Sequence, residues 1–427
     1  MPKVRERDRK QRMMWVGLQK TLALVSIAAI GWSVAVGLAA EPDEVAAVLE
    51  GQGRLFAVEE GRLHGPGGQW LVEHAGAARF TLIGESHHNA ETPLLTAALL
   101  HALQPSGYSA YVVESGPEST RLLMEAVAQD DVDAGVSLLR QFPFSIAFLD
   151  QKDELHTAAA ALDLGYEVWG VDQEFLGSPL LLLHRLAQLS SEPDERARMD
   201  DLMNREKAAL ERFLQTGDQS GAFLLSASAD DFAALAATFP KPDSEGARIV
   251  SQLRHSAEIY RAFAERRYYE NNATRVELIK RNFLRQLQGP DGQLPERRAL
   301  IKMGSVHAGR GRTPMHVYDI GNFAAELAFA QGGESFHVLV LAAGAVQADG
   351  TFHSWRERLP HLAPALDRVT EDSPMVFDLR PLRALLTQKA EKTEALADLQ
   401  ETALRYDALV VYPRFHPSRP IVTPPGQ

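Results

Sequence analysis

The sequence of 427 residues contains no cysteine. Disulfide bonds, thiolate ligands for a metal ion, a cysteine nucleophile and the lipid anchor of a lipoprotein are therefore all excluded. The chain also lacks a glycine-rich dinucleotide-binding fingerprint and a P-loop. No Gly-x-Ser-x-Gly elbow is present, which argues against a serine hydrolase. Hydrolysis by an activated water molecule, metal chemistry at nitrogen and oxygen ligands, and ligand binding stay open.

A stretch without charge lies near the N-terminus. Residues 21–40 carry no charged side chain, and the twenty residues before them hold seven Lys and Arg against two acidic residues, a local charge of +5. A basic segment followed by an apolar one predicts an export signal over residues 1–40. Gly37-Leu38-Ala39 offers a signal-peptide cleavage site, although twenty uncharged residues can also remain as a membrane anchor. We expect residues 41–427 to lie outside the cytoplasm, either free in the periplasm or anchored in the cytoplasmic membrane through residues 21–40.

The rest of the chain has no basic stripe of the kind that binds nucleic acid. Because the net charge of the whole chain is −12, the part that follows the export signal carries −17. Such an acidic protein repels the phosphate backbone, so we expect no nucleic-acid partner. With 45% apolar and 23% charged residues, most of the chain is expected to fold around a large core.

Six short runs rich in Val, Ile, Leu and Tyr are too brief for helices and predict buried strands. They are residues 79–84, 110–113, 167–171, 299–303, 337–341 and 408–412. Helical periodicity lies between several of them, over residues 93–103, 118–128 and 322–330. This alternation predicts an α/β fold with a mostly parallel central sheet flanked by helices.

The interval 178–297 breaks this alternation, because amphipathic patterns follow one another there without a convincing strand. Helices are expected over residues 192–215, 229–238, 247–269 and 274–287. We predict a helical insertion over 178–297, between a first half of the α/β core at 41–177 and a second half with a C-terminal tail at 298–427. The insertion is expected to form either a lid or wall beside the functional site or a second packing layer.

Acidic residues and histidines follow four of the six predicted strands. They are Glu85, His87 and His88 after the first strand, Glu114 after the second, Asp172 after the third and His307 after the fourth. Each has an ordinary explanation when taken alone, such as a helix cap for Glu114 or a polar loop for His87-His88. Because the carboxyl ends of parallel strands share one edge of the sheet, we expect these residues to meet in one site. Their negative charge must then be offset by protons, a metal ion or cationic partners.

Two kinds of chemistry fit these residue types. In the first, His87 or His88 removes a proton from a water molecule that attacks an ester or related carbonyl, while one of the three carboxylates orients the imidazole. His307 or Arg310 would stabilise the developing oxyanion. In the second, the site holds zinc, manganese or iron, and the metal lowers the pKa of its bound water. The ligands would be His87, His88, His307 and Glu114.

The segment after the first predicted strand resembles three related groups of proteins. Gly84-Glu85-Ser86-His87-His88 is similar to the Gly-Glu-x-x-His opening of the erythromycin esterase family, whose histidine is the base in lactone hydrolysis, and His88 matches that histidine. Counted to His87, the same stretch resembles the shorter Gly-Glu-x-His of the haem-uptake lipoproteins related to ChaN. It also resembles the Gly-x-x-His of TIKI-type metalloproteases.

The resemblance covers residues 77–175 and 298–412. Three further elements look like those of the esterases, namely Tyr111-Val-Val-Glu114, Gly170-Val-Asp172 and Tyr406-Asp-Ala-Leu-Val-Val411. A long helical insertion between the two halves also fits the esterases. The His-Asn-x-His signature expected in the later half appears as Gly304-Ser305-Val306-His307. Together with Gly311 and Pro314, this element looks more like the haem-uptake branch.

The resemblance to the esterases implies a hydrolase that acts on a small-molecule substrate and requires no cofactor, and the segment 1–40 adds the expectation that this hydrolase is exported. It places His88 as the base, with Glu85, His87, Glu114, Asp172 and His307 around it. The TIKI branch implies a hydrolase that depends on a divalent metal. The haem-uptake branch implies binding of haem or metal without a reaction, although its lipoproteins are tethered through a cysteine that this chain lacks.

Overall fold

The computed structural model describes residues 42–289, 292–369, 373–387 and 393–422. The predicted export signal, residues 1–40, lies outside the described residues. Within the described ranges, no helix combines the length and the apolar character needed to cross a membrane.

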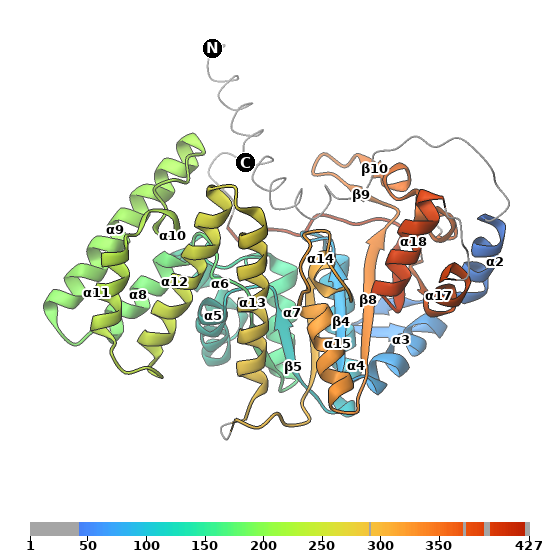
Figure 1. Cartoon of the computed structure of the whole chain (residues 1–427), viewed down its shortest axis with the longest axis horizontal. Helices are drawn as coiled ribbons and strands as arrows, with labels where there is room; N and C mark the ends of the chain where they lie inside the picture. The colour runs from blue at the N-terminus through green and yellow to red at the C-terminus, as the bar shows by residue number, and fades with distance from the viewer. Residues whose placement is uncertain (1–41, 290–291, 370–372, 388–392, 423–427) are drawn as a thin grey trace, which may run out of the picture.

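An eight-stranded sheet runs through the centre of the molecule in the order β1-β11-β12-β8-β4-β7-β5-β6 (Figure 1). The strands are β1 Gly53–Leu55, β4 Phe80–Glu85, β5 Tyr108–Val113, β6 Glu167–Gly170, β7 Arg298–Gly304, β8 Ser335–Ala342, β11 Met375–Asp378 and β12 Ala408–Tyr412. Neighbours from β12 to β6 pair in parallel, whereas β1 and β11 pair antiparallel. All six predicted strands are present, so the predicted α/β class with a mostly parallel sheet is confirmed. Two short hairpins, β2 (Ala57–Glu59) with β3 (Arg62–His64) and β9 (Gly344–Val346) with β10 (Phe352–Ser354), lie outside this sheet.

Helices cover both faces of the sheet, as the unbroken apolar runs of its strands require. One face packs on α3 Gly65–Ala77, α4 Glu91–Leu103, α5 Pro117–Asp130, α6 Val132–Gln141 and α7 Lys152–Asp163. The other packs on α2 Pro42–Gln52, α13 Tyr268–Leu287, α15 Ile320–Ala330, α16 Ala363–Leu366, α17 Arg380–Thr387 and α18 Glu394–Arg405. Successive side chains of a strand point to opposite faces of the sheet. In β4, Ile83 therefore belongs to the first core and Leu82 to the second.

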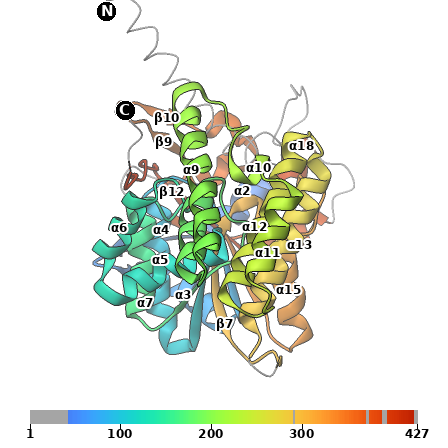
Figure 2. The same ribbon diagram turned by 90° about the vertical axis from the view of Figure 1, so that its left-hand side faces the viewer.

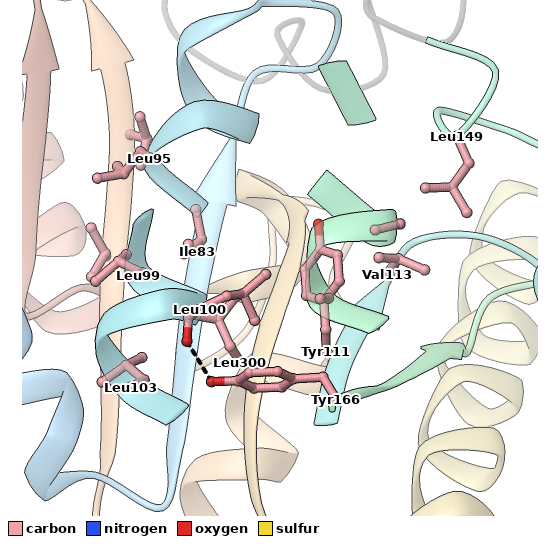
Figure 3. Close-up of a cluster of buried hydrophobic side chains, with 14 of the residues drawn as sticks. Ile83, Leu95, Leu99, Leu100, Leu103, Tyr111, Val113, Leu149, Tyr166 and Leu300 are labelled. Atoms are coloured by element: carbon pink, nitrogen blue, oxygen red, sulfur yellow. Dashed lines mark hydrogen bonds between the residues drawn. The ribbon is translucent and has the colours of Figure 1, made fainter. Parts of the chain in front are cut away.

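The first of these cores fixes the strands that carry the strand-end residues. Ile83 of β4, Tyr111 of β5 and Leu300 of β7 pack together with the leucines of α4 (Figure 3). The hydroxyl of Tyr166 donates to the carbonyl oxygen of Leu100 at 2.7 Å, which ties the segment before β6 to α4 (Figure 3). The carboxyl ends of β4, β7, β5 and β6 are therefore held in a fixed relation to one another.

A group of helices extends beyond the β6 edge of the sheet (Figures 1 and 2). It comprises α8 Pro179–Leu189, α9 Pro193–Thr216, α10 Phe223–Ser226, α11 Ala229–Thr238 and α12 Glu245–Ala264. These helices share an apolar cluster of their own, which includes Leu186, Met199 and Leu253. The last helix of the range 178–297, α13, instead packs on the sheet, where the ring of Phe283 meets that of Phe80 at 5.6 Å.

The C-terminal strap, residues 413–422, crosses the loops that follow β4 and α6. Its backbone forms four hydrogen bonds to them: Ser418 N to His88 O at 3.0 Å, Ala90 N to His416 O at 3.0 Å, Lys152 N to Arg419 O at 2.8 Å and Ile421 N to Asp150 O at 2.8 Å. The strap therefore fixes the backbone of the segment that carries His88.

Candidate functional site

The carboxyl ends of β4, β7, β5 and β6 lie next to one another in the sheet. Glu85 is the last residue of β4, Glu114 follows β5, Asp172 follows β6, and His307 lies on the short helix α14 (Ser305–Ala308) after β7. All four side chains are buried. The structure thus brings the residues that end or follow all four strands together at the carboxyl ends of these strands.

Glu114 contacts residues from three other segments. Its Oε2 accepts a hydrogen bond from the backbone N of Gly304 at 2.6 Å and lies 3.3 Å from Nε2 of His87. Its Oε1 accepts from Arg275 Nη2 at 2.8 Å and lies 3.5 Å from Nε2 of His307. Burial opposes ionisation of this carboxyl, but the positive charges of His307 and His87 outweigh burial and hold its pKa well below the usual range.

His87 lies between two carboxylates. Its Nδ1 is 3.0 Å from Oε1 of Glu85, its Nε2 faces Glu114, and its ring stacks on Phe148 with centroids 4.0 Å apart. Burial alone would lower the pKa of His87, but the charges of Glu114 and Glu85 outweigh burial and raise the pKa to about 9. His87 is therefore an imidazolium at neutral pH.

A buried lysine, Lys302, contacts the carboxylate of Glu85 that faces His87. Nζ of Lys302, on β7, donates to Oε1 of Glu85 at 2.5 Å and to Oε1 of Glu154, on α7, at 2.6 Å. Burial opposes the charge of Lys302, but Glu154 and Glu85 outweigh it and raise the pKa of the ammonium. Burial raises the pKa of Glu154 to about 7, whereas in Glu85 the effect of burial is overcome by Lys302 and the pKa is lowered. Lys302 thus supplies positive charge to two buried acids.

Two further ion pairs complete the site. The guanidinium of Arg275, on α13, donates to both carboxylate oxygens of Asp172. Burial opposes the charge of Arg275, but Asp172 and Glu114 outweigh it and raise the pKa. Nδ1 of His307 lies 2.6 Å from Oδ2 of Asp319, which caps the N-terminus of α15, and this carboxylate raises the pKa of His307 against the effect of burial. Glu85, Glu114 and Asp172 therefore each contact at least one basic side chain.

Four of these residues were missed by the sequence-based prediction: Glu154, Arg275, Lys302 and Asp319. Lys302 had a signal, because a lysine in the middle of an apolar strand needs a buried partner. Asp319 and Glu154 lie at the starts of helices, where acids are common, and Arg275 lies on one face of an amphipathic helix. Nothing local distinguished these three.

The interpretation of Arg310 as an oxyanion ligand is wrong. Its guanidinium donates to both carboxylate oxygens of Asp407, at 3.0 and 2.7 Å, and to the carbonyl oxygen of Ser335. Ser335 begins β8 and Asp407 directly precedes β12, so Arg310 lies at the opposite ends of the strands from the site. Arg275, which was not predicted, is the arginine that lines the cavity beside the site.

A cavity of about 220 Å³ opens beside these residues. Glu114, Asp172, Arg275 and His88 contribute polar groups to it. Much of its wall is aromatic, made by Phe144, Phe148, Phe175, Phe213 and Tyr260. The insertion helices α9 and α12 and the C-terminal strap contribute part of this wall. The insertion therefore lies beside the site as a wall.

His88 differs from its neighbour His87. Its backbone has a φ of +65°, in the left-handed region, and its ring lines the cavity, where it is accessible to water. No described residue forms a hydrogen bond with this imidazole. Loss of hydration beside the cavity wall disfavours the charged imidazolium and lowers the pKa of His88 to about 4, and the positive charge of His87 adds to this shift. His88 is therefore neutral at pH 7, with a free lone pair.

The fit of this site to a metal ion follows from the same contacts. In the described part of the chain, no three His, Asp or Glu side chains are arranged to hold a metal ion. Both ring nitrogens of His87 and of His307 face carboxylates, and Arg275 and Lys302 already offset the negative charge. The geometry gives no support to the metal alternative, which stays a prediction.

No protein-family model and no curated protein sequence matches the chain. Solved structures do match. A succinoglycan biosynthesis protein aligns with a TM-score of 0.56 at 10% identity, over 90% of this chain and 100% of that one. A Bacillus cereus protein aligns with a TM-score of 0.53 at 10% identity, over 88% and 98%. A variant of erythromycin esterase EreC in its open conformation aligns with a TM-score of 0.52 at 12% identity, over 83% and 95%.

At this identity the similarity establishes the fold alone. The chain shares its fold with erythromycin esterase EreC, so the resemblance seen in the sequence is confirmed at that level. The haem-binding protein ChaN of Campylobacter jejuni also aligns, over 68% of this chain and 91% of that one at 8% identity. Its TM-score of 0.26 is too low to establish a common fold.

Proposed function

We propose that the protein is an exported hydrolase in which His88 activates a water molecule against an ester or related carbonyl of a small-molecule substrate. The observation that carries this proposal is the position of His88, whose imidazole lines the cavity and forms no hydrogen bond with a described residue. Its lowered pKa is consistent with a neutral imidazole at pH 7. A general base needs such a free lone pair within reach of the water. His87 lacks one, because both of its ring nitrogens face carboxylates.

In the proposed reaction, a ring nitrogen of His88 takes a proton from water while the water oxygen bonds to the carbonyl carbon. The electron pair of the carbonyl moves to its oxygen, where the negative charge is stabilised by Arg275 on the wall of the same cavity. When the tetrahedral intermediate collapses, the bond from carbon to the leaving oxygen breaks. The imidazolium of His88 then gives its proton to the leaving alkoxide, and an acid and an alcohol are formed.

The remaining strand-end residues hold these two groups in place. Glu114 and Asp172 bind the guanidinium of Arg275. Glu85 and Glu114 keep His87 protonated, and the charge of His87 contributes to the low pKa of His88. An oxyanion that develops near His88 offsets the effect of His87, so the proton transfer becomes more favourable as the reaction proceeds. His307, held by Asp319, faces the second oxygen of Glu114.

The proposal requires no metal ion and no haem. The acids of the site are already offset by cationic side chains, among them Arg275, Lys302 and His87. A divalent cation placed among them would meet this positive charge, which weakens its binding. Haem or metal binding without turnover is the alternative outcome of the test described below.

Export is proposed from residues 1–40 alone, where a basic segment precedes twenty uncharged residues. Fractionation of a bacterial host with two membranes is the direct measurement. We expect the full chain in the periplasmic or the membrane fraction, and a chain that lacks residues 1–40 in the cytoplasm. Recovery of the full chain from the cytoplasm alone would contradict export.

Hydrolysis is tested with the full chain, purified in mild detergent, against a panel of nitrophenyl esters and lactones in the presence of EDTA. We expect turnover that resists the chelator, is lost in His88→Ala and is retained in the matched variant His101→Ala, whose histidine lies on α4 outside the cavity. Tight uptake of haemin with no turnover would favour the binding alternative, and turnover only after addition of Zn²⁺ or Mn²⁺ would favour the metal alternative.

A further inference from the structure

Two acids line the cavity on elements other than the site strands. Asp150 lies in the loop between α6 and α7, and Glu206 lies on the insertion helix α9. Neither takes part in the chemistry proposed for His88 and Arg275. Their charge therefore calls for another explanation.

Glu206 is buried with one carboxylate oxygen left over. The residue is 4% exposed, and its Oε2 accepts a hydrogen bond from the backbone N of Phe223 at 2.6 Å. No described residue donates to its Oε1. Burial raises the pKa of Glu206 to about 7. Oε1 of Glu206 is therefore open to water or to a ligand in the cavity.

Asp150 places a second carboxylate on the cavity wall. Its Oδ1 accepts a hydrogen bond from Nε2 of Gln151 at 2.9 Å, a contact with a neutral amide that leaves the charge of the carboxylate without a cationic partner. Burial raises the pKa of Asp150 to about 6. The backbone of the same residue is fixed by the C-terminal strap, since its carbonyl oxygen accepts from the N of Ile421. This carboxylate is therefore held in position.

The side chains that line the cavity carry an excess of negative charge, which also favours a cationic ligand. Four carboxylates face the cavity, namely Glu114, Asp150, Asp172 and Glu206, against a single guanidinium, Arg275. That guanidinium is already bound to Asp172 and Glu114. The two remaining acids therefore have no cation among the residues that line the cavity.

The aromatic side chains of the cavity wall give a second reason, independent of the acids, to expect a bound cation. Five rings line the same cavity, from Phe144, Phe148, Phe175, Phe213 and Tyr260. The faces of aromatic rings attract cations, and rings combined with carboxylates are the usual surroundings of a bound ammonium group. Phe144 and Phe148 both adopt a positive φ, at +61° and +62°. Bulky residues keep this costly conformation where a site requires it.

We propose that Asp150, Glu206 and the aromatic wall form a subsite for a positively charged ammonium group on an apolar body. The subsite itself is independent of catalysis. Its consequence for the substrate rests on the proposed function: the hydrolase acts on an ester that carries an amine, which binds at these acids while the carbonyl lies near His88 and Arg275.

Calorimetric titration of the full chain at pH 8 tests the subsite with three probes of similar size, phenethylamine, 2-phenylethanol and 3-phenylpropanoate. We expect the amine to bind roughly tenfold more tightly than the alcohol, and the carboxylate more weakly than both. Glu206→Gln and Asp150→Asn should each remove most of the preference for the amine while leaving the alcohol unaffected. Glu211→Gln, an exposed acid on the same helix, is the matched control and should bind all three probes like the wild type.

Equal binding of the three probes, tighter binding of the carboxylate, no binding of any probe, or an unchanged preference in both variants would each overturn the subsite. Circular dichroism checks that the variants are folded, which we expect because each replaces a carboxylate by a neutral amide of nearly the same shape. The binding measurements test the subsite, and the rate of hydrolysis tests the role of His88, so the two proposals can be rejected independently. If His88→Ala keeps both the amine affinity and the turnover, the subsite stands and the proposed role of His88 falls.

Discussion

The guanidinium of Arg275 binds the carboxylate of Asp172 with two nitrogens, Nε at 2.9 Å from Oδ1 and Nη2 at 2.5 Å from Oδ2. This geometry joins helix α13 to the end of strand β6, and a third contact reaches Glu114 after β5. A bidentate pair fixes the orientation of the guanidinium as well as its charge. The guanidinium of Arg275 is therefore held in a fixed orientation on the cavity wall.

Arg275→Lys keeps the positive charge but loses the paired geometry. We expect kcat for ester hydrolysis to fall by about 100-fold with KM little changed, because the loss of a positioned oxyanion donor acts on the transition state. Steady-state kinetics on the full chain measure both constants. Arg281→Lys, an exposed arginine on the same helix, is the control. A wild-type kcat in Arg275→Lys would remove Arg275 from the mechanism.

The rate of hydrolysis should depend on pH with two limbs. His88 must be neutral to accept a proton, and its pKa is lowered to about 4, so kcat/KM should rise as the pH increases through about 4. His87 must keep its charge, and its pKa is raised to about 9, so the rate should fall as the pH increases through about 9. A pH profile of kcat/KM checks this. A single limb near pH 7 would contradict the assignment.

Lys302→Met tests the buried ion pairs beneath His87. Removal of Nζ leaves Glu85 and Glu154 buried without their shared cation. We expect the free energy of unfolding to fall by about 3–5 kcal/mol at pH 8. Denaturant titration measures this change. Lys302→Met combined with Glu154→Gln should recover part of the loss, and a single variant as stable as the wild type would show that the pairs contribute nothing.

The C-terminal strap should matter for catalysis through one hydrogen bond. Ser418→Pro removes the N–H that donates to the carbonyl oxygen of His88 at 3.0 Å, whereas Ser418→Ala keeps it. Because His88 holds a positive φ, we expect the proline variant to lose kcat by roughly tenfold while the alanine variant keeps it. Kinetics of both variants decide the point. Equal kcat values in the two variants would mean that the strap does not position His88.

The sheet could be predicted because its parallel strands are buried on both faces. Runs such as residues 299–303 and 408–412 are apolar without interruption, which is typical of such strands. Two strands of this sheet were not predicted. β1 is three residues long at the edge of the sheet, and β11 is a four-residue strand next to it that carries the acidic Asp378 at its end. Short edge strands leave too weak a pattern in the sequence.

The site could be predicted only where topology alone decides the position. Glu85, Glu114 and Asp172 follow parallel strands, so they must share an edge. Arg275 reaches the same place from a helix whose packing depends on the whole fold. The different surroundings of His87 and His88 were also hidden, because the local sequence shows neither the positive φ of His88 nor the position of its ring in the cavity lining.

The central claim is that His88 activates water in a site that needs no metal, and its most direct test is the initial rate of ester hydrolysis by the full chain and by His88→Ala, both in EDTA. The account predicts turnover in the wild type and at least a roughly 100-fold lower kcat in the variant. Wild-type turnover that disappears in EDTA, or a variant as active as the wild type, would contradict it.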